Sequence, residues 1–463
     1  MTAPHDDKPV VLWRVLILRR DGHEILLGTH GTKFALPQIA IPAQQRIAAN
    51  INRGVERELG LHVISLYEIF LGNHSSLSDV FYHAAISAQP RERTPQGTYW
   101  TGVRSLTANS FSYEDDFAAI ESFRSGLESS ISVRTAEPFF KPNWFREVTS
   151  WVENSLRPHS LRLTGPFQQF NASSTFSLIR FETDGTPVWF KAVGAPNTRE
   201  FPITLALARV CPAYIPTVLA SKNEWNAWLA KEAPGNSLSS NADIRLWESA
   251  AASLAHLQIL TLPAAQEICK AGARNLRPSG LHSFVLPFFE FLAECVRKSQ
   301  TQDVEAHGNP SFHELSAAIQ DTFMALDRLR LPEAVGHMDL NPQNIFCSDR
   351  ACVFLDWAEA FVGCPFFSFE YLLQHFRHAF SSKSRLEARF RDSYIDPWRD
   401  LISSRDLEAA VALSPLAGLF TYAATLRASL TDNSSLSLPQ QTYLVRLARK
   451  MRLMMAEGKG VRP

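Results

Sequence analysis

The sequence has no excess of either charge, because 46 Lys and Arg residues balance 46 Asp and Glu residues. This balance argues against bulk affinity for nucleic acid or for an anionic membrane. The chain also has no run of eighteen apolar residues, and the polar stretch Met1–Pro9 contains no apolar segment of the signal-peptide type. We therefore expect a cytoplasmic protein without a membrane span.

The usual signs of a metal-binding or disulfide-rich protein are missing as well. The six cysteines have no paired metal-ligand spacing, and a chain of 463 residues does not need cross-links to fold. Hydrophobic residues make up 45% of the chain and charged residues 20%, which is enough apolar material for a sizeable core. We predict buried, reduced thiols in a globular chain of two or three domains.

One stretch, residues 335–357, gathers polar side chains between apolar runs. It reads Val-Gly-His-Met-Asp-Leu-Asn-Pro-Gln-Asn-Ile-Phe, and after a polar turn an apolar strand ends in Asp356. Asp339 is suited to accept the proton of an attacking hydroxyl, and Asn344 and Asp356 offer the hard oxygen ligands that Mg²⁺ prefers. Asp and Asn also shape turns, so a lone Asp-x-x-x-x-Asn would favour a simple turn instead.

The full string resembles the aminoglycoside phosphotransferase and choline kinase family, the small-molecule branch of the protein-kinase-like fold. The family pattern is His-Gly-Asp-x-x-x-x-Asn, and this chain has His337, Asp339 and Asn344 at those positions with Met338 in place of the Gly. The family's continuation after its metal-binding Asp, an Ala and then Gly-x-Pro, is matched by Ala360, Gly363 and Pro365.

This resemblance implies an enzyme that uses ATP and Mg²⁺. Asp339 would be the catalytic base, and Asn344 with Asp356 would hold the metal. His337 would support the catalytic loop rather than carry a proton. Many relatives have an Asp at the position of Ser368.

The N-terminal part alternates strand and helix patterns. Val10–Arg19, Val63–Leu71 and Val80–Ala88 are predicted strands, and Gln44–Leu59 is a predicted helix with one apolar stripe that Gly60 ends. This order resembles a Nudix hydrolase domain. The match to that family's metal-binding helix is poor, because the expected Gly and Glu positions hold other residues, namely Ile39, Gln45, Gly54 and Arg57.

Only Glu58 remains as a carboxylate of the Nudix pattern, and one carboxylate beside an Arg is a poor Mg²⁺ site. We therefore expect a Nudix-like domain over residues 1–150 that lacks hydrolase activity. An ordinary solvated helix face is the simpler interpretation of its charges. The segment Phe139–Trp144, near the predicted boundary, has the character of a docking or boundary segment.

Three predicted strands follow, Leu161–Gly165, Phe176–Thr183 and Val188–Val193. By resemblance, the predicted turn Gly165–Thr175 covers the nucleotide phosphates, with Ser173 and Ser174 among its small side chains. It has one Gly and no Gly-x-Gly-x-x-Gly, so a plain hairpin is an equal alternative.

A lysine in the apolar strand Val188–Val193 is costly unless it reaches a partner. By resemblance, Lys191 would meet the ATP phosphates and Glu200 at the start of the next helical stretch. The segment Trp225–Gly235 is similar to the hinge between kinase lobes.

The expected fold is thus α/β and α+β multidomain. A Nudix-like domain (1–150) is followed by a bilobal kinase-like phosphotransferase, whose N-lobe spans 151–235 and whose mainly helical C-lobe spans 236–463. We expect transfer of the ATP γ-phosphoryl group to a hydroxyl of a small molecule, without nucleic acid or membrane as partner. Two alternatives stay open, a non-catalytic nucleotide-binding regulator and a Nudix-type nucleoside diphosphate hydrolase.

Overall fold

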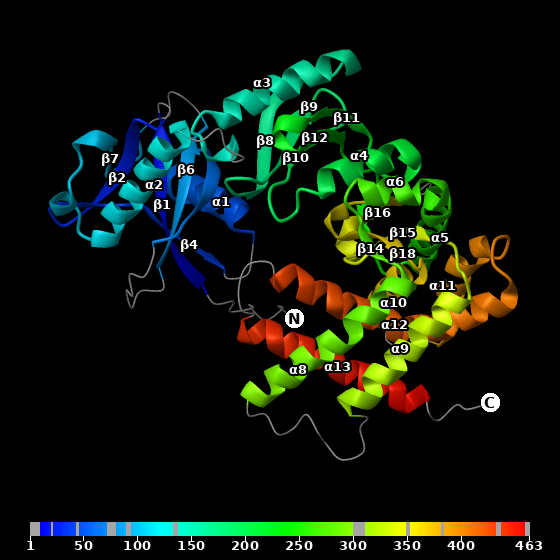
Figure 1. Cartoon of the computed structure of the whole chain (residues 1–463). Coiled ribbons are helices and arrows are strands. Elements are labelled where there is room, and N and C mark those ends of the chain that lie inside the picture. The colour runs from blue at the N-terminus through cyan, green and yellow to red at the C-terminus, as the bar shows by residue number, and fades with distance from the viewer. Residues whose placement is uncertain are drawn as a thin grey trace, which may run out of the picture. The chain divides into compact units, whose positions relative to one another are not determined.

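The structure is a computed structural model that describes residues 10–19, 22–42, 46–71, 80–88, 94–132, 138–299, 311–348, 352–380, 384–431 and 437–458. Figure 1 shows the chain with its elements labelled. It divides into two compact units, one formed by Met1–Phe201 with Val218–Glu232 and the other by Pro202–Thr217 with Ala233–Pro463. We describe each unit by itself. The predicted domain boundaries at residues 150 and 235 stay predictions.

The first unit contains two sheets. Strands of the N-terminal sheet lie in the order β3-β2-β1-β6-β5, with β4 paired to β1 and β7 to β2. Strands β1 and β6 are parallel, and the other pairs are antiparallel. The bounds are β1 Val10–Arg19, β2 Glu24–His30, β3 Lys33–Ala35, β4 Gln38–Pro42, β5 Val63–Ile69, β6 Val80–Ser87 and β7 Thr98–Gly102.

Helix α1 (Ile47–Leu59) follows the predicted periodicity and packs Ile51 and Val55 into the core. It ends at Gly60, whose φ of 68° is the left-handed conformation that glycine adopts at low cost. The first unit also contains α2 (Glu114–Ser132) and α3 (Trp144–Leu156). The described part of the predicted helix starts at Ile47, since residues 43–45 lie outside the described residues.

The second sheet is antiparallel, in the order β11-β12-β10-β9-β8. Its strands are β8 Leu163–Ala172, β9 Ser177–Thr183, β10 Val188–Ala192, β11 Val218–Lys222 and β12 Ala227–Lys231. The predicted long turn Gly165–Thr175 is wrong for its first eight residues, because they form most of β8. Gly165 and Pro166 lie where the β8–β9 register is interrupted. These two residue types, which favour turns, therefore mark an irregularity within a strand here.

The second unit is mainly helical, as predicted. Its helices are the greater part of α4 (Glu200–Val210), which starts in the first unit, and α5 Ile244–Thr261, α6 Ala265–Lys270, α7 Pro278–Leu281, α8 Val285–Ser299, α9 Phe312–Arg328, α10 Phe366–Phe380, α11 Ser384–Ile395, α12 Ser404–Thr431 and α13 Leu438–Gly458. Two small sheets complete it, one of β13 Asn236–Ser237, β16 Ile345–Cys347 and β17 Cys352–Phe354, the other of β14 Arg274–Leu276, β18 Ala360–Gly363 and β15 Ala334–His337.

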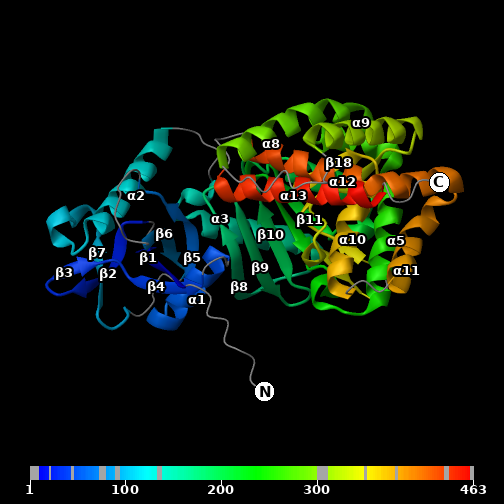
Figure 2. The same cartoon turned by 90° about the horizontal axis from the view of Figure 1, so that it is seen from below.

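Helix α12 is long and apolar enough over Ser404–Ala428 to cross a membrane, judged by length and composition alone. Core helices of soluble proteins pass the same test. In this unit α12 packs against α9, α10 and α13 (Figure 2), and its Ala410, Ala417 and Phe420 are fully buried. We interpret α12 as a core helix, and the cytoplasmic location stays a prediction.

Candidate active site

The segment that carries most of the predicted site residues runs from β15 to β18 in the second unit. Strand β15 ends at His337, and a loop leads through the short 3-10 helix Pro342–Asn344 into the β16–β17 hairpin. After β17 the chain reaches Asp356, which has a left-handed φ of 65°. Non-glycine residues seldom take this conformation, although Asp and Asn adopt it more readily than most. Asp349 and Arg350 of the predicted turn lie outside the described residues.

His337 joins the two ends of this segment through its ring. Its Nε2 lies 3.1 Å from the carbonyl oxygen of Leu355, and its Nδ1 lies 3.1 Å from the backbone nitrogen of Asp339. Because a carbonyl only accepts and an N–H only donates, Nε2 carries the proton and Nδ1 accepts. The ring is fully buried, and that burial lowers the pKa of His337. His337 is therefore a neutral brace between Asp339 and the residue before Asp356.

Asn344 links the same two segments, the one around Asp339 and the one around Leu355. Its side-chain amide nitrogen donates to the backbone carbonyl oxygen of Asp339 (3.3 Å). The backbone carbonyl oxygen of Asn344 accepts from the backbone N–H of Leu355 (2.8 Å). The structure thus brings Asp339, Asn344 and Asp356 together at the end of the hairpin.

The donor set fits a magnesium ion in a phosphoryl-transfer site. The Asn344 amide nitrogen is used inside the loop, which leaves its side-chain oxygen for a cation, and Asp356 is an exposed carboxylate. Among the described residues, no three His, Cys, Asp or Glu side chains form a metal site of their own. Mg²⁺ in such sites is held by one or two protein oxygens and completed by phosphates and water.

Asp339 is exposed and accepts a hydrogen bond at Oδ1 from the hydroxyl of Tyr371, 3.0 Å away on α10. Burial, followed by the charge of Asp339, raises the pKa of Tyr371, so the phenol stays protonated and donates. Sequence reasoning missed Tyr371. No local motif marks it, and only the packing of α10 beside β15 brings it to the loop.

Two departures from the family pattern are accommodated locally. Met338 is 2% exposed, and its backbone N–H donates to the carbonyl oxygen of Glu359 (3.0 Å). Ser368, where relatives have Asp, accepts the backbone N–H of His337 at 2.7 Å. Glu359 itself pairs with Arg274 at 3.0 Å, so its carboxylate has a structural partner.

Lys191 and Glu200 form an ion pair inside the first unit. The Lys191 Nζ lies 2.5 Å from Glu200 Oε1, and their side chains are 15% and 2% exposed. Lys191 is the fourth of five residues in β10, the central strand of the second sheet, and lies between Leu178 of β9 and Trp228 of β12. The expected pairing of strand lysine and helix acid is therefore present in the structure, while its role towards a nucleotide stays a prediction.

The turn between β8 and β9 is short, and its polar groups are mostly paired within the protein. The hydroxyl of Ser173 accepts from the backbone N–H groups of Thr175 (3.3 Å) and Phe176 (3.0 Å). The carbonyl oxygen of Ser174 accepts from the backbone N–H of Phe139 (3.2 Å). The Ser173 hydroxyl thus shapes the turn, and its predicted contact with phosphates stays a prediction.

A cavity of about 220 Å³ in the second unit is lined by one face each of α10, α12 and α13 and by Met338. Tyr371, Tyr422 and Tyr443 contribute hydroxyls, and the remaining walls are largely apolar. Glu370 also lines it, and the Oε2 atom of this buried side chain has no hydrogen-bond partner. Burial raises the pKa of Glu370 to about 7. Through Tyr371 the cavity reaches Asp339.

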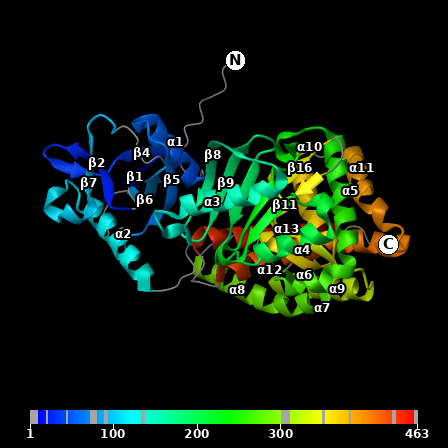
Figure 3. The same ribbon diagram turned by 90° about the horizontal axis from the view of Figure 1, so that it is seen from above.

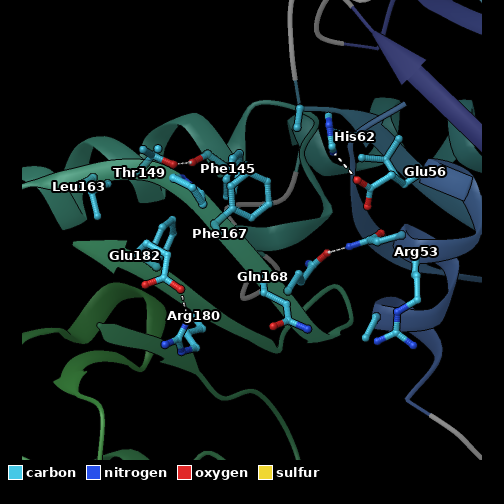
Figure 4. A pocket seen from close by; sticks show the side chains of 18 of the residues that line it. Arg53, Glu56, His62, Phe145, Thr149, Leu163, Phe167, Gln168, Arg180 and Glu182 are labelled. Carbon is cyan, nitrogen blue, oxygen red and sulfur yellow. Dashed lines mark hydrogen bonds and ion pairs between the residues drawn. The ribbon is translucent and has the colours of Figure 1, made fainter. Parts of the chain in front are cut away.

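A larger cavity, about 930 Å³, lies within the first unit (Figure 4). It is lined by α1, α3, β8 and β9 and includes none of the predicted site residues. Its charges pair largely among themselves, Glu56 with His62 at 3.5 Å and Arg180 with Glu182 and Glu232. The size of this cavity is therefore not a sign of catalysis.

The predicted Nudix-like helix, α1, is built without a cluster of acids. Glu58 pairs with Arg57 at 2.6 Å. A Cβ at Gly54 would lie 2.3 Å from the side chain of Ile39, so the two departures from the Nudix pattern depend on each other. A glutamate at position 54 would not fit beside this isoleucine. Gln45 lies outside the described residues, and the Nudix resemblance stays a prediction.

Comparison with known proteins bears on the second part of the chain. Residues 194–407 match the phosphotransferase enzyme family, a range that contains Glu200, His337, Asp339, Asn344 and Asp356. The chain thus carries a domain of this family, and the predicted kinase-like phosphotransferase fold with a helical C-terminal region is confirmed. No curated protein matches the chain in sequence at a significant level.

Among solved structures, an ethanolamine kinase from Plasmodium vivax is similar with a TM-score of 0.44 and 14% identity, covering 77% of this chain and 94% of its own. A macrolide 2′-phosphotransferase from Brachybacterium faecium has a TM-score of 0.40 and 14% identity, and the match covers 63% of this chain and 100% of that one. A protein from Ralstonia eutropha named as a putative aminoglycoside phosphotransferase has a TM-score of 0.42 and 17% identity, and the match covers 68% of this chain and 99% of that one.

Proposed function

We propose that this chain, which carries a phosphotransferase-family domain, transfers the γ-phosphoryl group of ATP to a hydroxyl of a small molecule. The observation that carries the proposal is the His337 brace. One neutral ring ties the loop of Asp339 to the residue before Asp356, so three residue types suited to phosphoryl transfer share one rigid edge.

In this proposal, Asp339 orients the acceptor hydroxyl and takes its proton. The hydrogen bond from Tyr371 occupies Oδ1 and leaves Oδ2 for the substrate. Asn344 and Asp356 would hold Mg²⁺, which when bound offsets the negative charge of the nucleotide phosphates. Lys191, kept in place by Glu200, would contact those phosphates, and the turn with Ser173 and Ser174 would cover them.

The cavity beside Tyr371 is the proposed acceptor site. Its volume of about 220 Å³ lies below the range of about 300–1,000 Å³ usual for sites that enclose drug-sized ligands. An acceptor of modest size is therefore favoured over one the size of a macrolide. The aromatic walls would contact its apolar part, and the free Oε2 of Glu370 would accept one of its hydrogen-bond donors.

The test is magnesium-dependent ATP binding by calorimetry, followed by ADP release across a panel of small hydroxyl compounds. We expect binding to the wild-type protein and to Asp339→Ala, and loss of magnesium-dependent binding in Asp356→Ala. Asp392→Ala is a matched control, because Asp392 is an exposed acid on α11 outside this site. Absence of ATP binding at any magnesium concentration would refute the proposal.

Turnover separates the remaining alternatives. A non-catalytic regulator would bind ATP without releasing ADP for any compound, and Asp339→Ala would leave its function intact. A hydrolase activity of the N-terminal domain would persist in Asp339→Ala and be lost in Glu58→Gln.

A further inference from the structure

The N-terminal domain and the second sheet of the first unit meet along one strand, β8. Figures 2 and 3 both show α1 and β5 beside β8, and both elements contact it. Strand β5 is the edge of the N-terminal sheet, and β8 is the edge of the second sheet. Strand β8 continues directly into the turn Ser173–Phe176, so whatever holds β8 also holds the base of that turn.

One buried glutamine links the two edges. The side-chain amide of Gln169, 2% exposed, donates to the carbonyl oxygen of Ser65 (2.9 Å) and accepts from the Ser65 backbone N–H (2.8 Å). Its oxygen also accepts from the side-chain amide of Asn52 on α1 (2.9 Å). Gln169 thus does for Ser65 what a neighbouring strand would do, and it satisfies the exposed edge of β5.

The strand registers are interrupted at this contact. The β5–β6 register shifts between Ser65 and Tyr67, and the β8–β9 register shifts between Gln169 and Asn171. Bulges re-aim side chains and end regular pairing, so they belong to the way in which the two edges meet.

A second contact comes from the segment that joins α2 to α3. Phe139 points its ring against Trp144 and Phe190, with ring centroids 5.1 and 6.1 Å away, while the ring of Phe140 stacks on Tyr67 of β5 at 4.9 Å. Two adjacent residues therefore insert into both halves of the first unit. The backbone N–H of Phe139 donates to the carbonyl oxygen of Ser174, which ties this segment to the turn itself.

One of the hydrophobic core clusters of the first unit spans both halves. This cluster of buried side chains includes Leu16, Ile64 and Phe123 of the N-terminal domain together with Ile179 and Phe190 of the second sheet. A shared core transmits displacement, because protein interiors are close-packed and deform little. The N-terminal domain is thus a fixed part of the surroundings of β8 rather than a separately tethered module.

We propose that the N-terminal domain is a clamp that positions the Ser173–Phe176 turn, through Gln169 on β8 and through Phe139 and Phe140 beside the turn. The inference rests on the proposed function in one respect, namely that this turn covers the nucleotide phosphates. Gln169 is then a positioning residue for ATP binding, although it has no contact with the nucleotide.

The test compares Gln169→Ala with Gln168→Ala on the same strand. Gln168 is exposed and points into the large cavity (Figure 4), so its loss removes the same chemical group without the link to Ser65. Amide hydrogen exchange of residues 173–176 and of β8 is measured in both variants and in the wild-type protein. The KM for ATP and kcat are measured on the same samples.

For Gln169→Ala we expect amide hydrogen exchange in the turn to accelerate by about tenfold, which corresponds to a free energy of opening lowered by about 1.4 kcal/mol. We expect the KM for ATP to rise by about three- to tenfold with kcat nearly unchanged, as for lost ground-state positioning. Gln168→Ala should match the wild-type protein in both respects. Phe140→Leu, which keeps an apolar side chain but loses the stacking on Tyr67, should change exchange and KM in the same direction by less.

Unchanged exchange of the turn in Gln169→Ala would overturn the clamp. A lowered melting temperature with unchanged KM would also overturn it, since that is the result of a merely structural contact. If the wild-type protein does not bind ATP, the proposed function fails, whereas the exchange measurement still decides whether the N-terminal domain holds the turn. If Gln169→Ala does not fold, Phe140→Leu provides the same two measurements.

Discussion

The two units treat the charges of their predicted site residues in opposite ways. In the first unit, Lys191 is neutralised by Glu200 at 2.5 Å, and the pair is mostly buried. In the second unit, Asp339 and Asp356 are exposed at the end of a hairpin, and no Lys or Arg among the described residues forms an ion pair with Asp339. Lys191 thus has its counter-charge within the protein, whereas Asp339 is in contact with water.

This difference agrees with the proposed binding of Mg²⁺ beside the exposed acids. Burying an ion pair is tolerable because each charge offsets the desolvation of the other, whereas unpaired acids are kept cheaply only in contact with water. The exposed position of Asp339 therefore carries no desolvation cost that the fold must offset. In the proposed function, Mg²⁺ and the acceptor add on the side of the exposed acids, while the ion pair of Lys191 is already formed in the protein.

The largest effect is expected from removal of the acid that would take the proton. Asp339→Ala should lower kcat by about 10²–10⁴, the usual contribution of general base catalysis, while ATP binding persists. Turnover of the best acceptor and calorimetric ATP binding check this. Asp392→Ala should match the wild-type enzyme. Equal turnover in Asp339→Ala would mean that the exposed acid is not catalytic.

Lys191→Met removes the ion pair between Lys191 and Glu200 in the first unit. We expect kcat/KM for ATP to fall by about a hundredfold, as for loss of one charged donor to a transition state. Stability should also fall by roughly 3 kcal/mol, because Glu200, 2% exposed, loses its ion pair with Lys191 while it stays buried.

The double variant Lys191→Met with Glu200→Gln separates these two effects. It should recover most of the lost stability in chemical denaturation, because no buried charge remains unpaired, and recover none of the lost activity. Recovery of activity would show that the pair is structural only.

Glu370 sharpens the comparison as an acid of the second unit that is buried instead of exposed. Its folded pKa of about 7 lies above the value of 4.5 for a free carboxyl, because burial penalises the charged form. The folded protein therefore holds this proton more tightly, and stability is lost as pH rises from about 4.5 through 7. Relative to Glu370→Gln, the wild-type protein should lose up to roughly 3 kcal/mol between pH 5 and 8.

Denaturant unfolding of both proteins at the two pH values measures this difference. A gap that does not change with pH would mean that Arg391, 3.7 Å from Glu370, keeps the carboxylate ionised throughout.

The smallest effect is expected from Tyr371→Phe, which removes only the hydroxyl that donates to Asp339. One hydrogen bond to a charged group corresponds to about tenfold or slightly more, so kcat should fall by about that factor. The KM for ATP should not change, since Tyr371 belongs to the acceptor side. A fall as large as that of Asp339→Ala would make Tyr371 part of the proton transfer itself.

The elements were largely readable from the sequence. The periodicity of α1 and its stop at Gly60, and the strands β9 and β10, follow local patterns of apolar spacing, and the mainly helical character of the second unit was predicted too. The error at Gly165–Thr175 has a local cause too. Gly and Pro indicate turns, and only pairing with β9 shows that here they interrupt a strand.

The sequence by itself determined the loop that carries His337, Asp339 and Asn344, because these residues lie within eight positions and interact through the backbone of the loop that they form. Only the tertiary structure decided what surrounds it. Tyr371 and Ser368 reach the loop from α10. In the first unit, likewise, Gln169 meets Ser65 across 104 positions of the chain. Short-range hydrogen bonding leaves a pattern in the sequence, whereas contacts made by packed elements leave none until those elements are assembled.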